Sequence, residues 1–139
     1  MNESLKDEIL LVDSHINSGE YQSAIDILRR LIDEFPDEGV LPFYLGHLSQ
    51  IGHENELALK YYSVAIKMGY VNADAYFSVA MLQKEFGQTS EAEKSFNKAL
   101  ELSVDDVEKW ACYSSLAILY LENKMYLKAE KISKLLVEK

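Results

Sequence analysis

Cysteine occurs once, at Cys112, so no disulfide can form within the chain and a cysteine-based zinc cluster is excluded. Only 2 prolines and 6 glycines occur in 139 residues, which argues against long irregular linkers. No apolar run reaches the roughly 20 residues that span a membrane, and the acidic first eight residues lack the apolar stretch of a secretory signal. These absences predict a cytoplasmic protein, although a chain trimmed of a signal or anchor would have the same features.

Basic residues are also scarce, since 14 lysines and arginines stand against 23 aspartates and glutamates, for a net charge of −9. This deficit argues against binding to nucleic acid, whose phosphates need basic neutralisation, and against anionic membrane surfaces. The charge is uneven, with −7 over residues 1–38 and +2 over residues 107–139. The acidic excess predicts a protein or peptide partner whose bound segment is neutral or basic.

Catalytic signatures are missing as well. The sequence contains no Gly-rich phosphate loop, no Gly-x-Ser-x-Gly elbow and no His-Glu-x-x-His motif. The three histidines, His15, His47 and His53, are spaced too irregularly to suggest a metal site, so surface or groove positions are expected for them. Cys112 precedes Tyr113 on a face expected to pack, which predicts a buried thiol and not a nucleophile. No enzyme activity and no cofactor are expected.

What the sequence does contain is a repeat with a period of 34 residues. The series that keep this period are Ala24, Ala58 and Ala92; Leu28, Tyr62 and Phe96; and Val12, Gly46 and Ala80. A fourth copy is displaced by three further residues and contains Leu116, Ala117, Tyr120 and Ala129. Small residues at a fixed period indicate helix pairs whose backbones approach closely, with a larger side chain filling the next gap. Such pairs bury their apolar faces only by stacking on one another.

On these residues the chain resembles the tetratricopeptide-repeat family, in which Leu-Gly and aromatic residues of a first helix pair with Ala and Phe of a second. The second copy supplies Leu45-Gly46 with Ala58, and the third supplies Ala92 with Phe96. The copies depart from the family pattern at the first-helix tyrosine, which is replaced by His15, Ser49 and Gln83. The resemblance implies an all-α fold, a right-handed superhelical array of about four helix-turn-helix hairpins. One domain over residues 1–139 is expected, with repeats at about 5–38, 39–72, 73–106 and 110–139.

Local signals predict where the helices begin and end. The expected helices are 5–18, 20–35, 39–51, 54–68, 73–86, 88–102, 106–123 and 125–138. Ser4 with Asp7, and Asp105 with Glu108, have the spacing of capping boxes. Gly19, Gly52 and Gly87 lie where the first helix of a hairpin should end. On the last helix, Met125, Ala129, Ile132 and Leu136 form an apolar stripe opposite four lysines.

In the tetratricopeptide family the first helices of successive hairpins line a concave groove, and this sequence places apolar residues among polar ones there. The candidate partner-binding residues are Ile9, Asp13, Phe43, Tyr44, His47, Phe77, Met81, Lys84 and Ile118. Aromatic and methionine anchors with an acidic rim suit an amphipathic helix or an extended segment of a partner. The alternative is that Phe43, Phe77 and Met81 fill the inside of a tightly curved array.

The resemblance to the tetratricopeptide family also implies particular functions, which can be compared with the residues of this sequence. Some tetratricopeptide co-chaperones hold a C-terminal carboxylate with basic groove residues, but here the matching positions include Asp13 and Asp74, which would repel it. The chain is similar to bacterial secretion chaperones only in size, acidity and repeats. Two further hypotheses are a weak homo-oligomer, in which the acidic N-terminal end of one copy docks on the lysine-faced last helix of another, and a fragment of a longer protein. Leu127 and Leu135 interrupt the lysine face and are expected to be ordinary surface leucines, the alternative being a contact with another chain. The leading hypothesis is a non-catalytic adaptor or chaperone-like scaffold.

Overall fold

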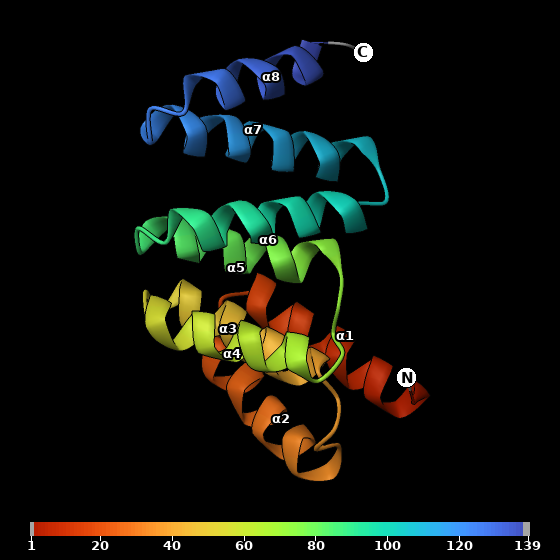
Figure 1. Ribbon diagram of the computed structural model, residues 1–139. Helices are drawn as coiled ribbons and strands as arrows, with labels where there is room; N and C mark the ends of the chain where they lie inside the picture. The colour runs from red at the N-terminus through yellow and green to blue at the C-terminus, as the bar shows by residue number, and fades with distance from the viewer. Residues whose placement is uncertain (1, 138–139) are drawn as a thin grey trace. The chain divides into compact units, whose positions relative to one another are not determined.

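The computed structural model describes residues 2–137 and shows only helices in that part of the chain (Figure 1). The helices are α1 (Glu3–Asn17), α2 (Tyr21–Glu34), α3 (Val40–Ile51), α4 (Asn55–Lys67), α5 (Ala73–Glu85), α6 (Thr89–Leu102), α7 (Asp106–Glu122) and α8 (Tyr126–Val137). The prediction of an all-α fold built from helical hairpins is therefore confirmed. Among the described residues, none of these helices has both the length and the apolar character needed to cross a membrane.

The helices group into two compact units. Unit 1 contains α1–α4 and ends at Tyr70, and unit 2 contains α5–α8 and begins at Val71. Each unit consists of two hairpins whose helices run antiparallel (Figure 1). The division falls beside the boundary predicted between the second and third repeats, at residue 72. Each unit therefore holds two of the expected repeats, and a single domain over residues 1–139 stays a prediction.

The turn inside every hairpin has the same backbone geometry. Its left-handed position is occupied by Gly19, His53, Gly87 and Lys124, with φ of 76°, 62°, 74° and 59°. The next backbone N–H donates to a carbonyl five residues back, as from Glu20 to His15 at 2.8 Å and from Met125 to Tyr120 at 2.8 Å. This bond is the one that closes a helix in the Schellman motif. Gly52 ends α3 as its C-cap, as expected from its position, but its φ is −81° and the left-handed residue of this turn is the following one, His53.

Side-chain caps begin three of the four first helices. Asn2 Oδ1 accepts from the backbone N–H of Ser4 at 2.7 Å, so α1 begins before Ser4 and the capping box predicted at Ser4 and Asp7 was wrong. Asn72 Oδ1 accepts from Ala75 N–H at 2.8 Å at the start of α5. At α7 the predicted cap forms, since Asp105 Oδ1 accepts from Glu108 N–H at 2.9 Å, while the Glu108 carboxylate accepts from Val104 N–H, one residue before the N-cap. These caps satisfy backbone donors that a helix terminus leaves unpaired.

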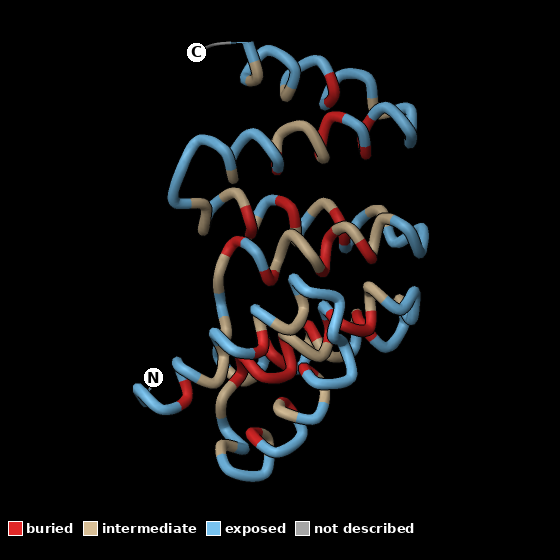
Figure 2. The backbone as a smooth tube through the Cα atoms, turned by 180° about the vertical axis from the view of Figure 1, so that it is seen from behind, coloured by how far each residue is buried: buried red, intermediate tan, exposed pale blue. Residues whose placement is uncertain are grey.

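Unit 1 is held by a core that lies where its helices face one another (Figure 2). Its buried members are Leu5, Val12, Ala24, Leu28, Leu31, Val40, Leu41 and Leu48. The repeated small residues act as expected, because a Cβ on Gly46 would lie 2.7 Å from two ring atoms of Tyr62. Helices α3 and α4 therefore approach closely only because position 46 has no side chain.

Unit 2 has a separate core of the same kind. Its buried members are Ala80, Ala92, Phe96, Leu116, Leu119, Tyr120 and Ala129. A polar contact joins three helices at its edge, since Glu93 Oε2 accepts from Tyr120 Oη at 2.6 Å and from Lys128 Nζ at 2.9 Å. The apolar stripe predicted on α8 is confirmed, because Ala129 is buried while Met125 and Ile132 pack against this core.

Candidate functional site

In unit 1 the predicted binding residues mostly take part in packing. Phe43 is 9% exposed, and its ring centroid lies 5.4 Å from that of Tyr62 and 4.9 Å from that of Tyr70. Ile9 is half-buried against the unit 1 core. The first helices α1 and α3 are linked where Tyr44 Oη donates to Asp13 Oδ1 at 2.7 Å.

His47 is the one member of the predicted set in unit 1 that is exposed, among the described residues. Phe43 and Ile9 take part in packing. Asp13 and Tyr44 are hydrogen-bonded to each other. From this set, unit 1 therefore offers a partner the exposed His47 and the accessible parts of Ile9, Asp13 and Tyr44, and little of Phe43.

In unit 2 the predicted residues are more accessible. Phe77 and Met81 of α5 are half-buried and rest on the unit 2 core, where Phe77 meets Phe96 edge to face at 5.7 Å between ring centroids. Ile118 of α7 is 48% exposed. Lys84 Nζ lies 3.4 Å from Glu122 Oε1, so an ion pair connects α5 and α7 at one end.

A longer apolar row on α7 was missed by the sequence analysis. Besides Ile118, the exposed apolar side chains of this helix are Val107, Trp110 and Leu121, of which Leu121 is 54% exposed. Their separations of three, eight and three residues place them within one face of a helix with 3.6 residues per turn. The signal was present in the sequence, because Leu121 follows Lys84 by 37 residues, the same interval that relates Met81 to Ile118.

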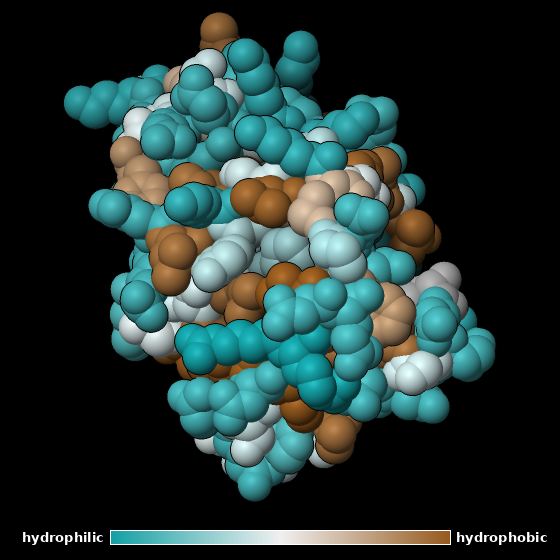
Figure 3. Space-filling view, turned by 90° about the horizontal axis from the view of Figure 1, so that it is seen from below, coloured by the Kyte–Doolittle hydropathy of each residue, from teal (hydrophilic) through white to brown (hydrophobic). Residues whose placement is uncertain are grey.

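Together these residues define a surface that we call the α5–α7 surface. Its members are Asp74, Phe77, Met81 and Lys84 of α5, and Val107, Ala111, Ile118 and Leu121 of α7. On α5 the charged Asp74 and Lys84 flank Phe77 and Met81, whereas the members on α7 are all apolar. Unit 1 also has an apolar hollow, lined among others by Ile32, Phe35, Leu45 and Val64. On the face drawn in Figure 3, small apolar groups are separated by polar side chains. Dispersed exposure of that kind is ordinary for a folded protein.

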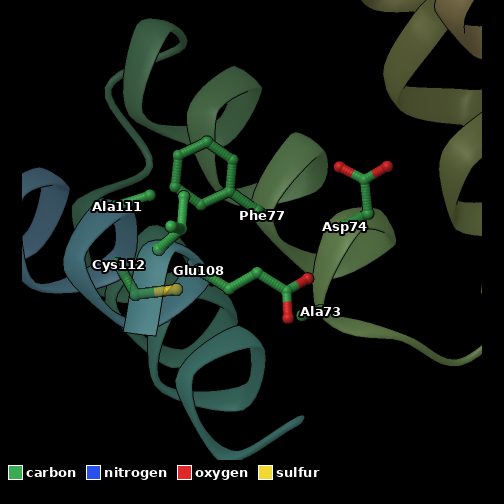
Figure 4. A pocket seen from close by; sticks show the side chains of 7 residues that line it. Ala73, Asp74, Phe77, Glu108, Ala111 and Cys112 are labelled. Atoms are coloured by element: carbon green, nitrogen blue, oxygen red, sulfur yellow. The ribbon is translucent and has the colours of Figure 1, made fainter. Parts of the chain in front are cut away.

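At one end of the α5–α7 surface lies a hollow of about 230 Å³ between the first turns of the two helices (Figure 4). It is lined by Ala73, Asp74 and Phe77 of α5 and by Glu108, Ala111 and Cys112 of α7, with Val107 beside them. The Glu108 carboxylate is held in place, because its Oε1 accepts from the backbone N–H of Val104 at 2.8 Å. The hollow therefore combines apolar walls with two carboxylates.

Cys112 contributes an unreactive wall to this hollow. Burial raises the pKa of its thiol and outweighs the lowering effect of the Ser103 hydroxyl, whose oxygen lies 3.9 Å from the sulfur, and the Glu108 carboxylate adds a smaller rise. A thiol with a raised pKa holds little of the thiolate that a nucleophile needs. Over residues 2–137, no group of three or more His, Cys, Asp or Glu side chains is arranged to hold a metal ion.

Comparison with known families identifies two repeats in this chain. The family models that match are described as Tetratricopeptide repeat, one over residues 10–38 and the other over residues 73–105. A sequence relative is the UDP-N-acetylglucosamine–peptide N-acetylglucosaminyltransferase of Giardia intestinalis, 33% identical over 115 residues that make up 81% of this chain. The chain spans about 8% of the length of that transferase.

Solved structures share the fold at low sequence identity. A crystal structure of MamA matches with a TM-score of 0.81 at 20% identity, over 96% of this chain and 76% of that one. The type III secretion translocator chaperone SycD of Yersinia enterocolitica matches with a TM-score of 0.75 at 22% identity, over 88% and 87%. At these identities the likeness establishes the arrangement of helices and nothing about partners.

Proposed function

Because this chain belongs to the tetratricopeptide-repeat family, we propose that it is a protein-binding scaffold that holds an apolar segment of a partner on the α5–α7 surface. The fold of this family is typically a non-catalytic interaction module. The chain spans only about 8% of the Giardia transferase, so the activity of that enzyme is not carried over to it.

The observation that supports this proposal is the apolar row on α7 that its own unit leaves exposed. Ile118 is 48% exposed and Leu121 is 54% exposed, and both lie on the face shared with Val107 and Trp110. Phe77 and Met81 extend the apolar area onto α5 and are supported from below by the core. Apolar anchors on a rigid helical support, with charged side chains at the ends, suit an amphipathic helix or an extended peptide.

The predicted residues of unit 1 take a smaller part in this proposal. His47 is exposed, but Ile9 and Phe43 lie against the core, and Asp13 is bonded to Tyr44. We therefore place the main anchors in unit 2 and expect substitution of Phe43 to act first on folding.

A display library of random peptides, selected on the immobilised protein, tests the proposal. The affinities of the selected peptides are then measured for the wild type and for the double variant Ile118→Glu/Leu121→Glu. We expect a loss of about tenfold or more, because each substitution places an uncompensated charge in an apolar contact. Both side chains are half exposed, so the variant should retain the helical circular dichroism of the wild type.

A matched control is available on α8, where Leu127 and Leu135 are 85% and 43% exposed. The variant Leu127→Glu/Leu135→Glu likewise replaces two exposed aliphatic side chains and adds the same charge in the same unit. It should bind the selected peptides within about twofold of the wild type. Loss of binding in this control alone would overturn the α5–α7 assignment and favour the terminal helix as the contact surface. A selection that yields no peptide would overturn the binding function itself.

A further inference from the structure

The hollow at the start of α5 and α7 has the size of a single side chain. Its volume of about 230 Å³ lies below the roughly 300–1,000 Å³ of pockets that bind whole small molecules. It is continuous with the α5–α7 surface, because Phe77 and Ala111 belong to both. A segment bound along that surface would therefore place one of its side chains over the hollow.

The walls of the hollow favour a side chain with an apolar stem and a cationic end. Phe77, Ala111 and Cys112 supply apolar contact, and Asp74 and Glu108 supply two carboxylates (Figure 4). Within the described part of the chain, the Asp74 side chain makes no hydrogen bond or ion pair. Lysine and arginine pack their methylene groups on apolar walls and direct their charge to carboxylates. The Phe77 ring can also attract a cation through its face.

The charges around the hollow favour the binding of a cation over the binding of an anion. The N-termini of α5 and α7 carry about half a positive charge each, which opposes the carboxylates. The first turn of α7 adds Asp106, and its N-cap residue is Asp105. With Asp74 and Glu108 there are four carboxylates near these two helix ends, against the exposed Lys109. The local charge is negative, so a carboxylate or phosphate would be repelled.

We propose that this hollow is a socket for one lysine or arginine side chain of the bound segment. This specificity rests on the proposed function of the α5–α7 surface. Asp74 and Met81 are seven residues apart on α5, a distance of about 10 Å along the helix. The basic residue should therefore be separated from the apolar residue that contacts Met81 by about three positions in an extended segment. In a helical segment the separation should be about seven positions.

A direct test uses Nα-acetyl-arginine amide as the probe and Nα-acetyl-norleucine amide as its uncharged counterpart. Backbone amide shifts are followed by NMR in the wild type and in Asp74→Asn/Glu108→Gln, which removes both charges and keeps acceptor oxygens. We expect saturable shifts at Asp74, Glu108 and Ala111 with the arginine probe, and weakening of about fivefold in the variant. Equal binding of the norleucine probe, no saturable shift, or an unchanged variant would each overturn the socket.

The display-selected peptides provide the second test and separate this inference from the proposed function. Selected peptides should carry a lysine or arginine at one of the two predicted separations, and Asp74→Asn/Glu108→Gln should bind them about fivefold more weakly. The control Glu91→Gln/Glu101→Gln removes the same charge from exposed positions of α6 and should bind normally. Peptides that depend on Ile118 and Leu121 but carry no basic residue would overturn the socket and leave the binding surface standing.

Discussion

At the scale of single residues, the turns of the four hairpins show how backbone conformation selects a side chain. The left-handed position holds glycine in two hairpins and His53 or Lys124 in the others. An L-residue with a Cβ in this conformation is disfavoured by roughly 1–2 kcal/mol, whereas glycine adopts it freely. The hairpins containing Gly19 and Gly87 therefore close with less strain than those containing His53 and Lys124.

Substitution of Gly19 tests this directly. A Cβ at position 19 meets no atom within 4 Å, so Gly19→Ala should destabilise by about 1 kcal/mol through backbone conformation alone. Gly52→Ala is the matched control, because its φ is −81° and its added Cβ would have ordinary contacts from 3.6 Å. Gly52→Ala should be neutral or stabilising by up to about 1 kcal/mol. Urea unfolding measures both, and equal effects would contradict the assignment of position 53 as the left-handed residue.

At the scale of helices, a contact among side chains from three helices secures unit 2. Glu93 of α6 accepts hydrogen bonds from Lys128 of α8 and Tyr120 of α7, and both bonds lower the pKa of the Glu93 carboxyl below its ordinary value of 4.5. The Lys128 amine also lies 5.5 Å from the centroid of the Tyr120 ring. Burial, together with the Glu93 carboxylate, raises the pKa of the Tyr120 hydroxyl, which stays protonated as a donor at neutral pH.

The lowered pKa of Glu93 makes this contact dependent on pH. A carboxyl with a lowered folded pKa contributes stability above its unfolded pKa and loses it as pH falls through the folded pKa. Glu93→Gln should therefore cost up to about 1 kcal/mol at pH 7, given that Lys128 is half exposed, and this cost should shrink toward pH 3. Glu130→Gln, from a fully exposed pair with Lys134, should change little. A cost for Glu93→Gln that stays constant between pH 7 and pH 3 would contradict this account.

At the scale of the whole chain, the two units differ in charge. Residues 1–70 contain 5 basic and 12 acidic side chains, for a net charge of −7, whereas residues 71–139 contain 9 and 11, for a net charge of −2. Charge of one sign opposes the compact state by self-repulsion. Unit 1 should therefore be the more sensitive of the two to ionic strength.

Hydrogen exchange at two salt concentrations checks this difference. Raising NaCl from about 0.01 M to about 1 M shortens the screening length from roughly 30 Å to roughly 3 Å. The slowest amides of α1–α4 should then gain about 0.5 kcal/mol more opening free energy than those of α5–α8. General effects of concentrated salt act on both units, so the difference between them is the readout. Equal gains would mean that the net charge of unit 1 does not limit its stability.

The sequence by itself determined the helices, the hairpins and the repeat family of this protein. Apolar and small residues at a period of 34 encode contacts between neighbouring helices, so Ala24, Ala58 and Ala92 are all fully buried, as their spacing predicts. Helix ends follow from short-range chemistry, although the residue that caps α1 is Asn2 and not Ser4, and the left-handed residue after α3 is His53 and not Gly52.

Only the tertiary structure decided which residues beyond this pattern are accessible. Phe43 and Phe77 occupy equivalent places one period apart, yet Tyr62 and Tyr70 pack on Phe43 and leave it 9% exposed, whereas Phe77 packs on Phe96 and stays half-buried. The hollow likewise brings together Asp74 and Glu108, which lie 34 residues apart in the sequence. The physical reason is that helical periodicity specifies which face a residue occupies, whereas exposure depends on which side chains of other helices pack against that face.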